Sequence, residues 1–181
     1  MVNKQENKLK EKTLKKKAKQ VKLLLTDSDG VLTDTGVYYS ANGEELKRFS
    51  IRDGMGVERL RNLVKVETGI MTGENSGSVK KRAEKLGISE LHLECKDKAT
   101  ELERIMTLKN LKLEEIAFIG DDMNDMEIMT KVGLSACPSD AYPEIKKEAD
   151  FICENRGGYG AFREFAEYII LAQYKKKNLE K

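Results

Sequence analysis

Three aspartates lie within eight residues in the stretch VKLLLTDSDGVLTD, where Asp27 and Asp29 follow a run of apolar residues. Carboxylates this close repel one another unless a cation lies between them. The carboxylates of Asp27, Asp29 and Asp121 are hard oxygen ligands, which suit Mg²⁺ because this ion binds few carboxylates and completes its shell with water or phosphate. Further polar residues follow later apolar runs: Thr72 and Gly73 in MTGE, Lys98 in ECKDK, and Asp121, Asp122 and Asp125 in GDDMND.

This set of side chains predicts phosphoryl transfer. With a cation bound, a phosphate dianion can approach Asp27, whose carboxylate can attack phosphorus to form an aspartyl phosphate. Lys98 and Thr72 would stabilise charge on the transferring oxygens. Asp29 would protonate the leaving alkoxide and later deprotonate the attacking water. Lys96 is the alternative to Lys98, because one lysine among 33 basic residues is a weak signal by itself.

The strands and helices that position these groups are predicted to form an α/β fold over residues 21–174, a Rossmann-like doubly wound parallel sheet. This follows because short apolar runs alternate with segments of helical period. Ligands bind beyond the carboxyl ends of the strands in such a sheet, where the polar groups above are placed. We expect strands over Lys22–Thr26, Val66–Met71, Leu91–Cys95, Ile116–Ile119, Leu134–Ala136 and Phe151–Cys153. We expect helices over Gly56–Leu63, Ser76–Leu86, Lys98–Leu108, Asp125–Val132 and Ala161–Tyr174.

One segment interrupts the alternation of strands and helices. GVYYSANGEELKRFSI places two strand-like runs around Ala41–Asn42–Gly43, and Asn-Gly is a strong signal for a β-hairpin. Because residues 36–50 come directly after the aspartate cluster, we expect this hairpin to act as a flap over the site.

The charge pattern sets the two chain ends apart from the body. Residues 1–20 carry eight lysines against Glu6 and Glu11, which gives a local charge of +6. Because the whole chain has a net charge of +2, the remaining residues carry a net charge of −4. We interpret residues 1–20 as a solvated, frayed basic extension rather than a nucleic-acid arm or membrane helix, because Leu9 and Leu14 provide too small an apolar face. We expect residues 175–181 to form a solvated basic tail.

The remaining composition favours a cytoplasmic protein without a membrane or nucleic-acid partner. No apolar run approaches the length of a membrane span, and the leader does not resemble a secretory signal. Cys95, Cys137 and Cys153 are expected to be unpaired thiols, buried as small apolar residues. His92 is the single histidine, and nothing pairs it with a nucleophile or metal ligands, so we expect a structural role.

The order of DSDGVLT, MTGE, Lys98 and GDDMND resembles the four motifs of the haloacid dehalogenase-like phosphatases, from about Val21 to Tyr168. RDGMGV, the hairpin and RGGYGAFREF resemble the subgroup without a cap domain that includes 3-deoxy-D-manno-octulosonate 8-phosphate and nonulosonate 9-phosphate phosphatases. Ser28 departs from the usual apolar residue of the first motif, which puts packing of the first strand in doubt.

This resemblance assigns roles to individual residues. It implies that Asp27 is the nucleophile, that Asp29 is the acid/base, and that Thr72 and Lys98 bind phosphate. It also implies a Mg²⁺ ion held by Asp27, the backbone carbonyl of Asp29, and Asp121. Asp122 and Asp125 remain either ligands or supports of the ligands, and the second role is favoured because Mg²⁺ seldom takes a cage of carboxylates only.

The resemblance further implies a homotetramer in which the C-terminal segment RGGYG, with Arg156, helps to complete a neighbouring site. The expected substrate is a 3-deoxy-2-ulosonate phosphate with eight or nine carbons. Glu74 follows Thr72 and would favour nine carbons, and Arg82 or Lys85, three residues apart on a helix, would pair with the substrate carboxylate. An exposed helix with ordinary charged residues explains Arg82 and Lys85 equally well.

Two other functions are compatible with parts of the pattern. A phosphoacceptor receiver module also has an aspartate-lined Mg²⁺ site and a lysine, but it lacks the acid/base of Asp29 and the hairpin. A noncatalytic phosphatase-like oligomerisation module would not need the full set of Asp27, Asp29, Thr72, Lys98 and Asp121.

Overall fold

The computed structural model describes residues 4–174, so the predicted tail over 175–181 lies outside the described residues. The sheet has six strands in the order β5-β4-β1-β6-β7-β8, and all of its pairings are parallel. The strands are β1 (Leu23–Thr26), β4 (Glu67–Met71), β5 (Glu90–His92), β6 (Ile116–Ile119), β7 (Leu134–Cys137) and β8 (Phe151–Ile152). Every residue of β1 and β6 is buried, as expected for central strands covered on both faces.

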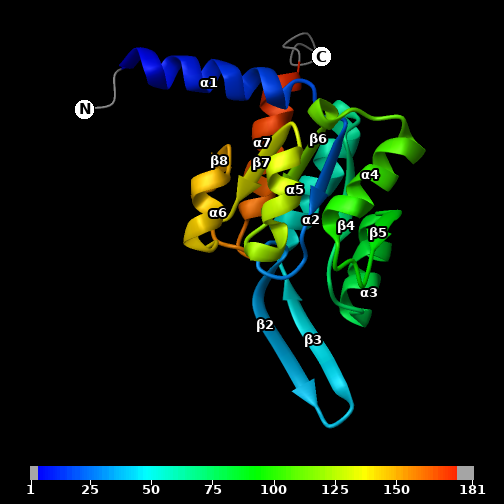
Figure 1. The fold of residues 1–181 in the computed structure, drawn as a ribbon. Coiled ribbons are helices and arrows are strands. Elements are labelled where there is room, and N and C mark those ends of the chain that lie inside the picture. Colours follow the sequence, from blue (N-terminus) through cyan, green and yellow to red (C-terminus); the bar gives the residue numbers. More distant parts are fainter. Residues whose placement is uncertain (1–3, 175–181) are drawn as a thin grey trace, which may run out of the picture.

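Helices cover both faces of this sheet (Figure 1). The bounds are α2 (Ile51–Arg59), which continues as a π-helical turn over Leu60–Val64, α3 (Gly77–Leu86), α4 (Lys98–Lys109), α5 (Met126–Lys131), α6 (Pro143–Glu148) and α7 (Ala161–Gln173). Successive side chains of β1 enter different cores, since Leu24 packs with α2, α3 and α7, whereas Leu23 and Leu25 pack with α4, α5 and α6. The predicted doubly wound α/β fold is confirmed.

Helix α2 begins five residues earlier than the predicted helix over Gly56–Leu63. Ser50 caps it by accepting a hydrogen bond from the Asp53 amide at 3.3 Å. Gly56 lies where a Cβ would be 3.2 Å from Cα of Arg163, so glycine allows α2 and α7 to pack closely. Asp53 in turn accepts a hydrogen bond from the Arg163 amide at 2.9 Å, in the first turn of α7. RDGMGV and RGGYGAFREF therefore contact each other.

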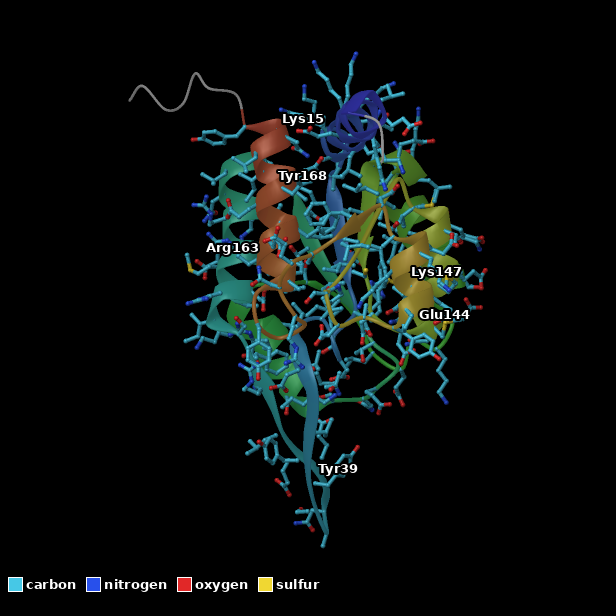
Figure 2. The ribbon with its side chains drawn as sticks, turned by 90° about the vertical axis from the view of Figure 1, so that its left-hand side faces the viewer. Lys15, Tyr39, Glu144, Lys147, Arg163 and Tyr168 are labelled. Atoms are coloured by element: carbon cyan, nitrogen blue, oxygen red, sulfur yellow. The ribbon has the colours of Figure 1, made fainter. Side chains whose placement is uncertain are left out.

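The expectation of a frayed N-terminal extension is wrong for residues 4–18, which form helix α1 (Lys4–Ala18). Its C-terminal half packs on the body through Leu14 and the fully buried Ala18. Lys17 forms an ion pair with Asp150 at 2.7 Å, and the Gln173 amide donates to the Ala18 carbonyl at 2.9 Å. Lys15 of the same helix has an exposed side chain (Figure 2). Within residues 4–174, no helix is both long and apolar enough to span a bilayer.

The predicted hairpin is present as a separate two-stranded antiparallel sheet, formed by β2 (Thr33–Ser40) and β3 (Gly43–Phe49). It extends away from the body as a narrow arm, with Tyr39 towards its tip (Figures 1 and 2). Gly43 adopts φ 108° after the turn, a conformation that favours glycine. The base of the hairpin touches the aspartate cluster, as described below, while the tip points into solvent.

Candidate active site

Asp27 lies directly after β1, between the loops that follow β4 and β6. Its amide donates to the Ile119 carbonyl at 3.0 Å, so the parallel ladder continues to the residue itself, and its carboxyl group is buried. Gly30 (φ 85°) turns the chain against the loop after β6. A Cβ on Gly30 would lie 1.9 Å from Oδ2 of Asp121, so only glycine permits this approach.

The carboxylates of Asp27, Asp121 and Asp125 place one oxygen each within 4.8 Å of the others. Burial, reinforced by the charges of Asp27 and Asp125, raises the pKa of Asp121 to about 8. Burial and the charge of Asp125 likewise raise the pKa of Asp27. Oδ1 of Asp121 is buried and has no hydrogen-bond partner among residues 4–174. An orphaned carboxylate oxygen beside other carboxylates fits a hard divalent cation such as Mg²⁺.

Lys98, the first residue of α4, brings a positive charge into this cluster. Its Nζ atom lies 2.9 Å from Oδ1 of Asp27 and 2.5 Å from Oδ1 of Asp125. Burial opposes the charge, but the two carboxylates outweigh burial and raise the pKa of Lys98 above its usual value. Lys96, the alternative considered from the sequence, is exposed.

Asp125 uses both carboxylate oxygens within the protein. Oδ1 binds Lys98, and Oδ2 accepts hydrogen bonds from the amides of Asp121 at 2.9 Å and Asp122 at 3.5 Å. These contacts fit the supporting role favoured from the sequence, because they fix the loop that carries Asp121. Asp122 is exposed and accepts from the Met123 amide at 2.7 Å.

Asp29 is held by two side chains of the hairpin. Thr33 Oγ1 donates to Oδ1 at 3.2 Å, and Lys47 Nζ donates to Oδ2 at 2.7 Å. Sequence reasoning missed Lys47, and the available signal was only a lysine in a predicted flap strand near an acidic cluster. Ser28, between the two aspartates, is fully buried, and its hydroxyl has no partner within the described chain.

Thr72 directly follows β4, at the same edge of the sheet as Asp27. Its amide donates to the His92 carbonyl at 2.9 Å, and its buried hydroxyl accepts from the Glu74 amide at 3.2 Å. The hydroxyl proton is therefore free to point elsewhere, as a phosphate-binding role requires. Gly73 has open space beside it, since a Cβ there would meet nothing within 4 Å.

The residues expected to select the substrate lie outside the carboxylate cluster. These residues are Glu74, Arg82, Lys85 and Arg156. Within residues 4–174, no hydrogen bond or ion pair joins their side chains to the carboxylates of the cluster. Arg82 donates to the Ser50 carbonyl at 2.7 Å, and Arg156 pairs with Asp140 at 3.0 Å. The side chains of Glu74 and Lys85 are exposed to solvent.

The glycines of RGGYG pack on the loop that carries the aspartates of the same chain. The Gly158 amide donates to the Val31 carbonyl at 2.8 Å. A Cβ on Gly157 would lie 1.8 Å from the Gly30 carbonyl oxygen, so a larger residue would displace this loop. Arg48 of the hairpin also donates to the Gly158 carbonyl at 2.8 Å. RGGYG therefore packs against the loop that carries Asp27 and Asp29 and is hydrogen-bonded to the hairpin.

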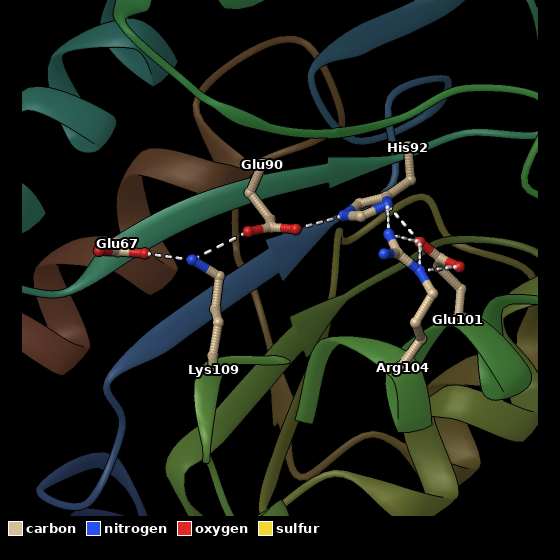
Figure 3. Close-up of polar contacts among 6 residues, drawn as sticks. All are labelled: Glu67, Glu90, His92, Glu101, Arg104 and Lys109. Atoms are coloured by element: carbon tan, nitrogen blue, oxygen red, sulfur yellow. Dashed lines mark hydrogen bonds and ion pairs between the residues drawn. The ribbon is translucent and has the colours of Figure 1, made fainter. Parts of the chain in front are cut away.

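His92 belongs to a separate polar cluster between β5 and α4 (Figure 3). Its Nε2 lies 2.7 Å from Glu90 and its Nδ1 lies 2.5 Å from Glu101. Arg104 and Lys109 neutralise these glutamates through ion pairs at 2.6 and 2.9 Å. The cluster ties the edge strand to the helix that begins with Lys98, which agrees with the structural role expected for His92.

Comparisons with known proteins extend these observations. A family model described as haloacid dehalogenase-like hydrolase matches residues 65–160. The 3-deoxy-D-manno-octulosonate 8-phosphate phosphatase KdsC of Escherichia coli K12 is 38% identical over 159 residues, which cover 88% of this chain and 84% of that protein. The cobalt-bound deoxy-D-mannose-octulosonate 8-phosphate phosphatase from Haemophilus influenzae has a TM-score of 0.85 at 34% identity, covering 91% of this chain and 96% of its own.

A second similar structure is a complex with ligands. The 3-deoxy-D-manno-octulosonate 8-phosphate phosphatase from Moraxella catarrhalis, in complex with magnesium ion, phosphate ion and KDO, has a TM-score of 0.85 at 34% identity. The match covers 88% of this chain and 91% of that chain.

These similarities span most of the chain and agree with its architecture. Residues 4–174 form one parallel sheet with flanking helices and a hairpin, without a separate cap domain. The alternative of a phosphoacceptor receiver module is wrong, because the family model and the relatives all point to phosphatases and their hydrolase family. The chain belongs to the haloacid dehalogenase-like hydrolases, in the capless group that contains the 3-deoxy-D-manno-octulosonate 8-phosphate phosphatases.

Proposed function

We propose that this protein is a cytoplasmic, Mg²⁺-dependent phosphomonoesterase that hydrolyses a 3-deoxy-2-ulosonate phosphate through an aspartyl phosphate on Asp27. One observation carries the proposal: the carboxylates of the buried Asp27 and Asp125 and the half-buried Asp121 converge, and Lys98 lies 2.9 Å from Asp27. The same chain is 38% identical to a phosphatase of an eight-carbon ulosonate phosphate. The cluster supports a reaction in which a carboxylate meets a phosphate dianion.

Each residue of the site has a separate role in the proposed reaction. When bound, Mg²⁺ would neutralise the carboxylates of Asp27 and Asp121, with the backbone carbonyl of Asp29 as a further ligand, and would lower the repulsion of the substrate. Asp27 attacks phosphorus while Lys98 and the Thr72 hydroxyl stabilise the transferring oxygens. Asp29 donates a proton to the departing alcohol oxygen and then accepts one from the water that attacks the aspartyl phosphate.

The length of the substrate is the finer part of the proposal. The relatives named above act on eight-carbon substrates by their names, whereas Glu74 supports acceptance of nine carbons. Glu74 and Lys85 have exposed side chains and are free to reach a bound sugar acid. Arg82 would have to leave the Ser50 carbonyl to do so, which makes Lys85 the better candidate for the substrate carboxylate.

The proposal is tested by measuring phosphate release from eight-carbon and nine-carbon ulosonate phosphates, glucose 6-phosphate and 4-nitrophenyl phosphate, with Mg²⁺ or EDTA. We expect the highest kcat/KM with the ulosonate phosphates and loss of turnover in EDTA. Glu74→Ala should lower the nine-to-eight-carbon ratio of kcat/KM. Lys85→Ala should raise KM for both by roughly tenfold, the scale of one charge-assisted hydrogen bond.

Lys81→Ala is the matched control for Lys85, because Lys81 is an exposed lysine on the same helix. It should leave both KM values within about twofold. A preference for glucose 6-phosphate would contradict the substrate class. Unchanged selectivity and KM in Glu74→Ala and Lys85→Ala would contradict the roles of these two residues but not the phosphatase activity.

Assembly into a homotetramer is also part of the proposal. Tyr38, Tyr39 and Leu46 of the hairpin are each more than 60% exposed, which supports burial of this arm between subunits. Sedimentation velocity should give a tetramer for the wild type and smaller species for Tyr39→Ser combined with Leu46→Ser. Arg156→Ala should reduce kcat/KM for the ulosonate phosphate more than for 4-nitrophenyl phosphate. A fully active monomer would refute the tetramer.

A further inference from the structure

Lys47 has a buried, positively charged side chain on the projecting hairpin. Its side chain is 1% exposed, whereas Tyr39 and Leu46 of the same hairpin lie mostly in solvent. A buried ammonium is costly unless it is paired. Lys47 Nζ lies 2.7 Å from Oδ2 of Asp29 and 3.3 Å from Oε2 of Glu44. Burial opposes its charge, but these two carboxylates outweigh burial and raise the pKa of Lys47.

Both side-chain contacts that hold the Asp29 carboxylate come from the hairpin. Thr33, which binds Oδ1, is the first residue of β2, and Lys47, which binds Oδ2, lies on β3. Thr33 and Phe49 are paired at the base of the hairpin, so the two contacts belong to one rigid unit. The orientation of Asp29 therefore depends on where the hairpin lies.

A β-bulge allows Lys47 to use a second anchor. Residues three apart on a regular strand face opposite sides, yet Glu44 and Lys47 contact each other. Tyr38 pairs with Leu46 and Tyr39 pairs with Glu44, so Glu45 is an extra residue that resets the alternation. The bulge thereby places both charged side chains on the face that meets the body.

Glu44 extends the contact to the phosphate-binding side of the site. Its Oε1 atom accepts a hydrogen bond from Ser76 Oγ. Ser76 is the N-cap of α3, the helix that follows Thr72 and Gly73. Asp29, Lys47, Glu44 and Ser76 form a continuous chain from the aspartate loop to the start of this helix.

We infer that Lys47 is a positioning residue that holds the Asp29 carboxyl group in the orientation in which, in its acid form, it gives a proton to the oxygen of the leaving group. The hairpin then forms part of the acid–base machinery in addition to covering the site. This inference rests on the proposed phosphatase function. Lysine suits the position because its compact ammonium fits between two carboxylates.

The test compares a poor leaving group with a good one. A sugar alkoxide needs a proton from Asp29, whereas 4-nitrophenolate leaves without one. Lys47→Met should reduce kcat/KM for the ulosonate phosphate by roughly ten- to hundredfold, part of the usual contribution of an acid–base group, and for 4-nitrophenyl phosphate by less than about threefold. The loss should lie in kcat, with KM within about twofold, because Lys47 does not bind the substrate.

Two variants separate positioning from docking of the hairpin. Glu44→Ala removes the second anchor and keeps the contact of Lys47 with Asp29, so the ratio of kcat/KM values for the two substrates should stay within about threefold of wild type. Lys47→Arg keeps the charge and the docking but misplaces the donor, so it should show an intermediate loss with the same dependence on the leaving group. Lys81→Met controls for loss of a lysine ion pair elsewhere.

Several results would overturn the inference. Equal losses on both substrates, or a loss confined to KM, would mean that Lys47 serves folding or substrate binding. If Lys47→Met fails to fold, Lys47→Arg decides by the same criterion.

If the wild type releases no phosphate from either substrate, the proposed function fails. Crystal structures of wild type and Lys47→Arg then test separately whether Lys47 positions Asp29. An unchanged Asp29 rotamer in the Lys47→Arg structure would overturn the positioning role of Lys47, and a displaced rotamer would support this role.

Discussion

Replacing Asp27 with asparagine is expected to lower kcat by about four orders of magnitude or more while the fold stays intact, because an amide cannot act as the attacking carboxylate. The substitution is nearly isosteric, and Lys98 keeps its ion pair with Asp125 at 2.5 Å. The thermal midpoint should therefore not fall by more than a few degrees. Phosphate release and circular dichroism melting curves of the same preparation check both parts.

Asp34→Asn is a matched control in the same stretch of sequence. Asp34 lies at the base of the hairpin, where it pairs with Arg48 at 2.6 Å and is removed from the carboxylate cluster. Its substitution should change kcat by no more than about threefold. Substantial turnover by folded Asp27→Asn would exclude Asp27 as the nucleophile.

Lys98→Met should combine a large loss of activity with a large loss of stability. The substitution leaves the buried carboxylates of Asp27 and Asp125 without their lysine partner, and breaking a buried pair costs about 3–5 kcal/mol. Loss of a charge that stabilises the transferring oxygens should lower kcat by roughly 100-fold or more. Thermal unfolding with and without Mg²⁺ should show a larger stabilisation by Mg²⁺ in the variant than in wild type, because the ion supplies the missing positive charge.

The control for this result is Lys96→Met, because Lys96 is exposed. It should change the free energy of unfolding by less than about 0.5 kcal/mol and leave turnover near the wild-type value. Wild-type stability of Lys98→Met would show that the contacts at 2.9 and 2.5 Å contribute nothing to the fold.

The sheet and the carboxylate site could be predicted from the sequence because both depend on local patterns. β6 has the predicted bounds Ile116–Ile119, and α3 begins one residue after Ser76 because Ser76 is its cap. Asp27 and Asp121 follow apolar runs that form neighbouring parallel strands, so the rule for carboxyl ends brings them together. The resemblance to the phosphatases added the individual roles.

The missed elements depend on contacts between distant residues. α6 contains a single buried residue, Ile145, so PEIKKE shows no helical period. α1 docks through Ala18 and Lys17, whose partners Gln173 and Asp150 are more than 130 residues away. Likewise, Lys47 contacts Asp29, 18 residues away, and Glu44 shares its face only because of the bulge at Glu45, so a strand pattern read with strict alternation cannot reveal these two contacts together.

The central position of β1 has a consequence for hydrogen exchange. β1 lies between β4 and β6, while the short strands β5 and β8 form the two edges of the sheet. Amide protons exchange first where local opening is easiest, at edges and projecting hairpins, and last in the central strands. The amide of Asp27, which donates to the Ile119 carbonyl, belongs to this slowest group. Fraying of the edges therefore leaves the backbone of the nucleophile in place.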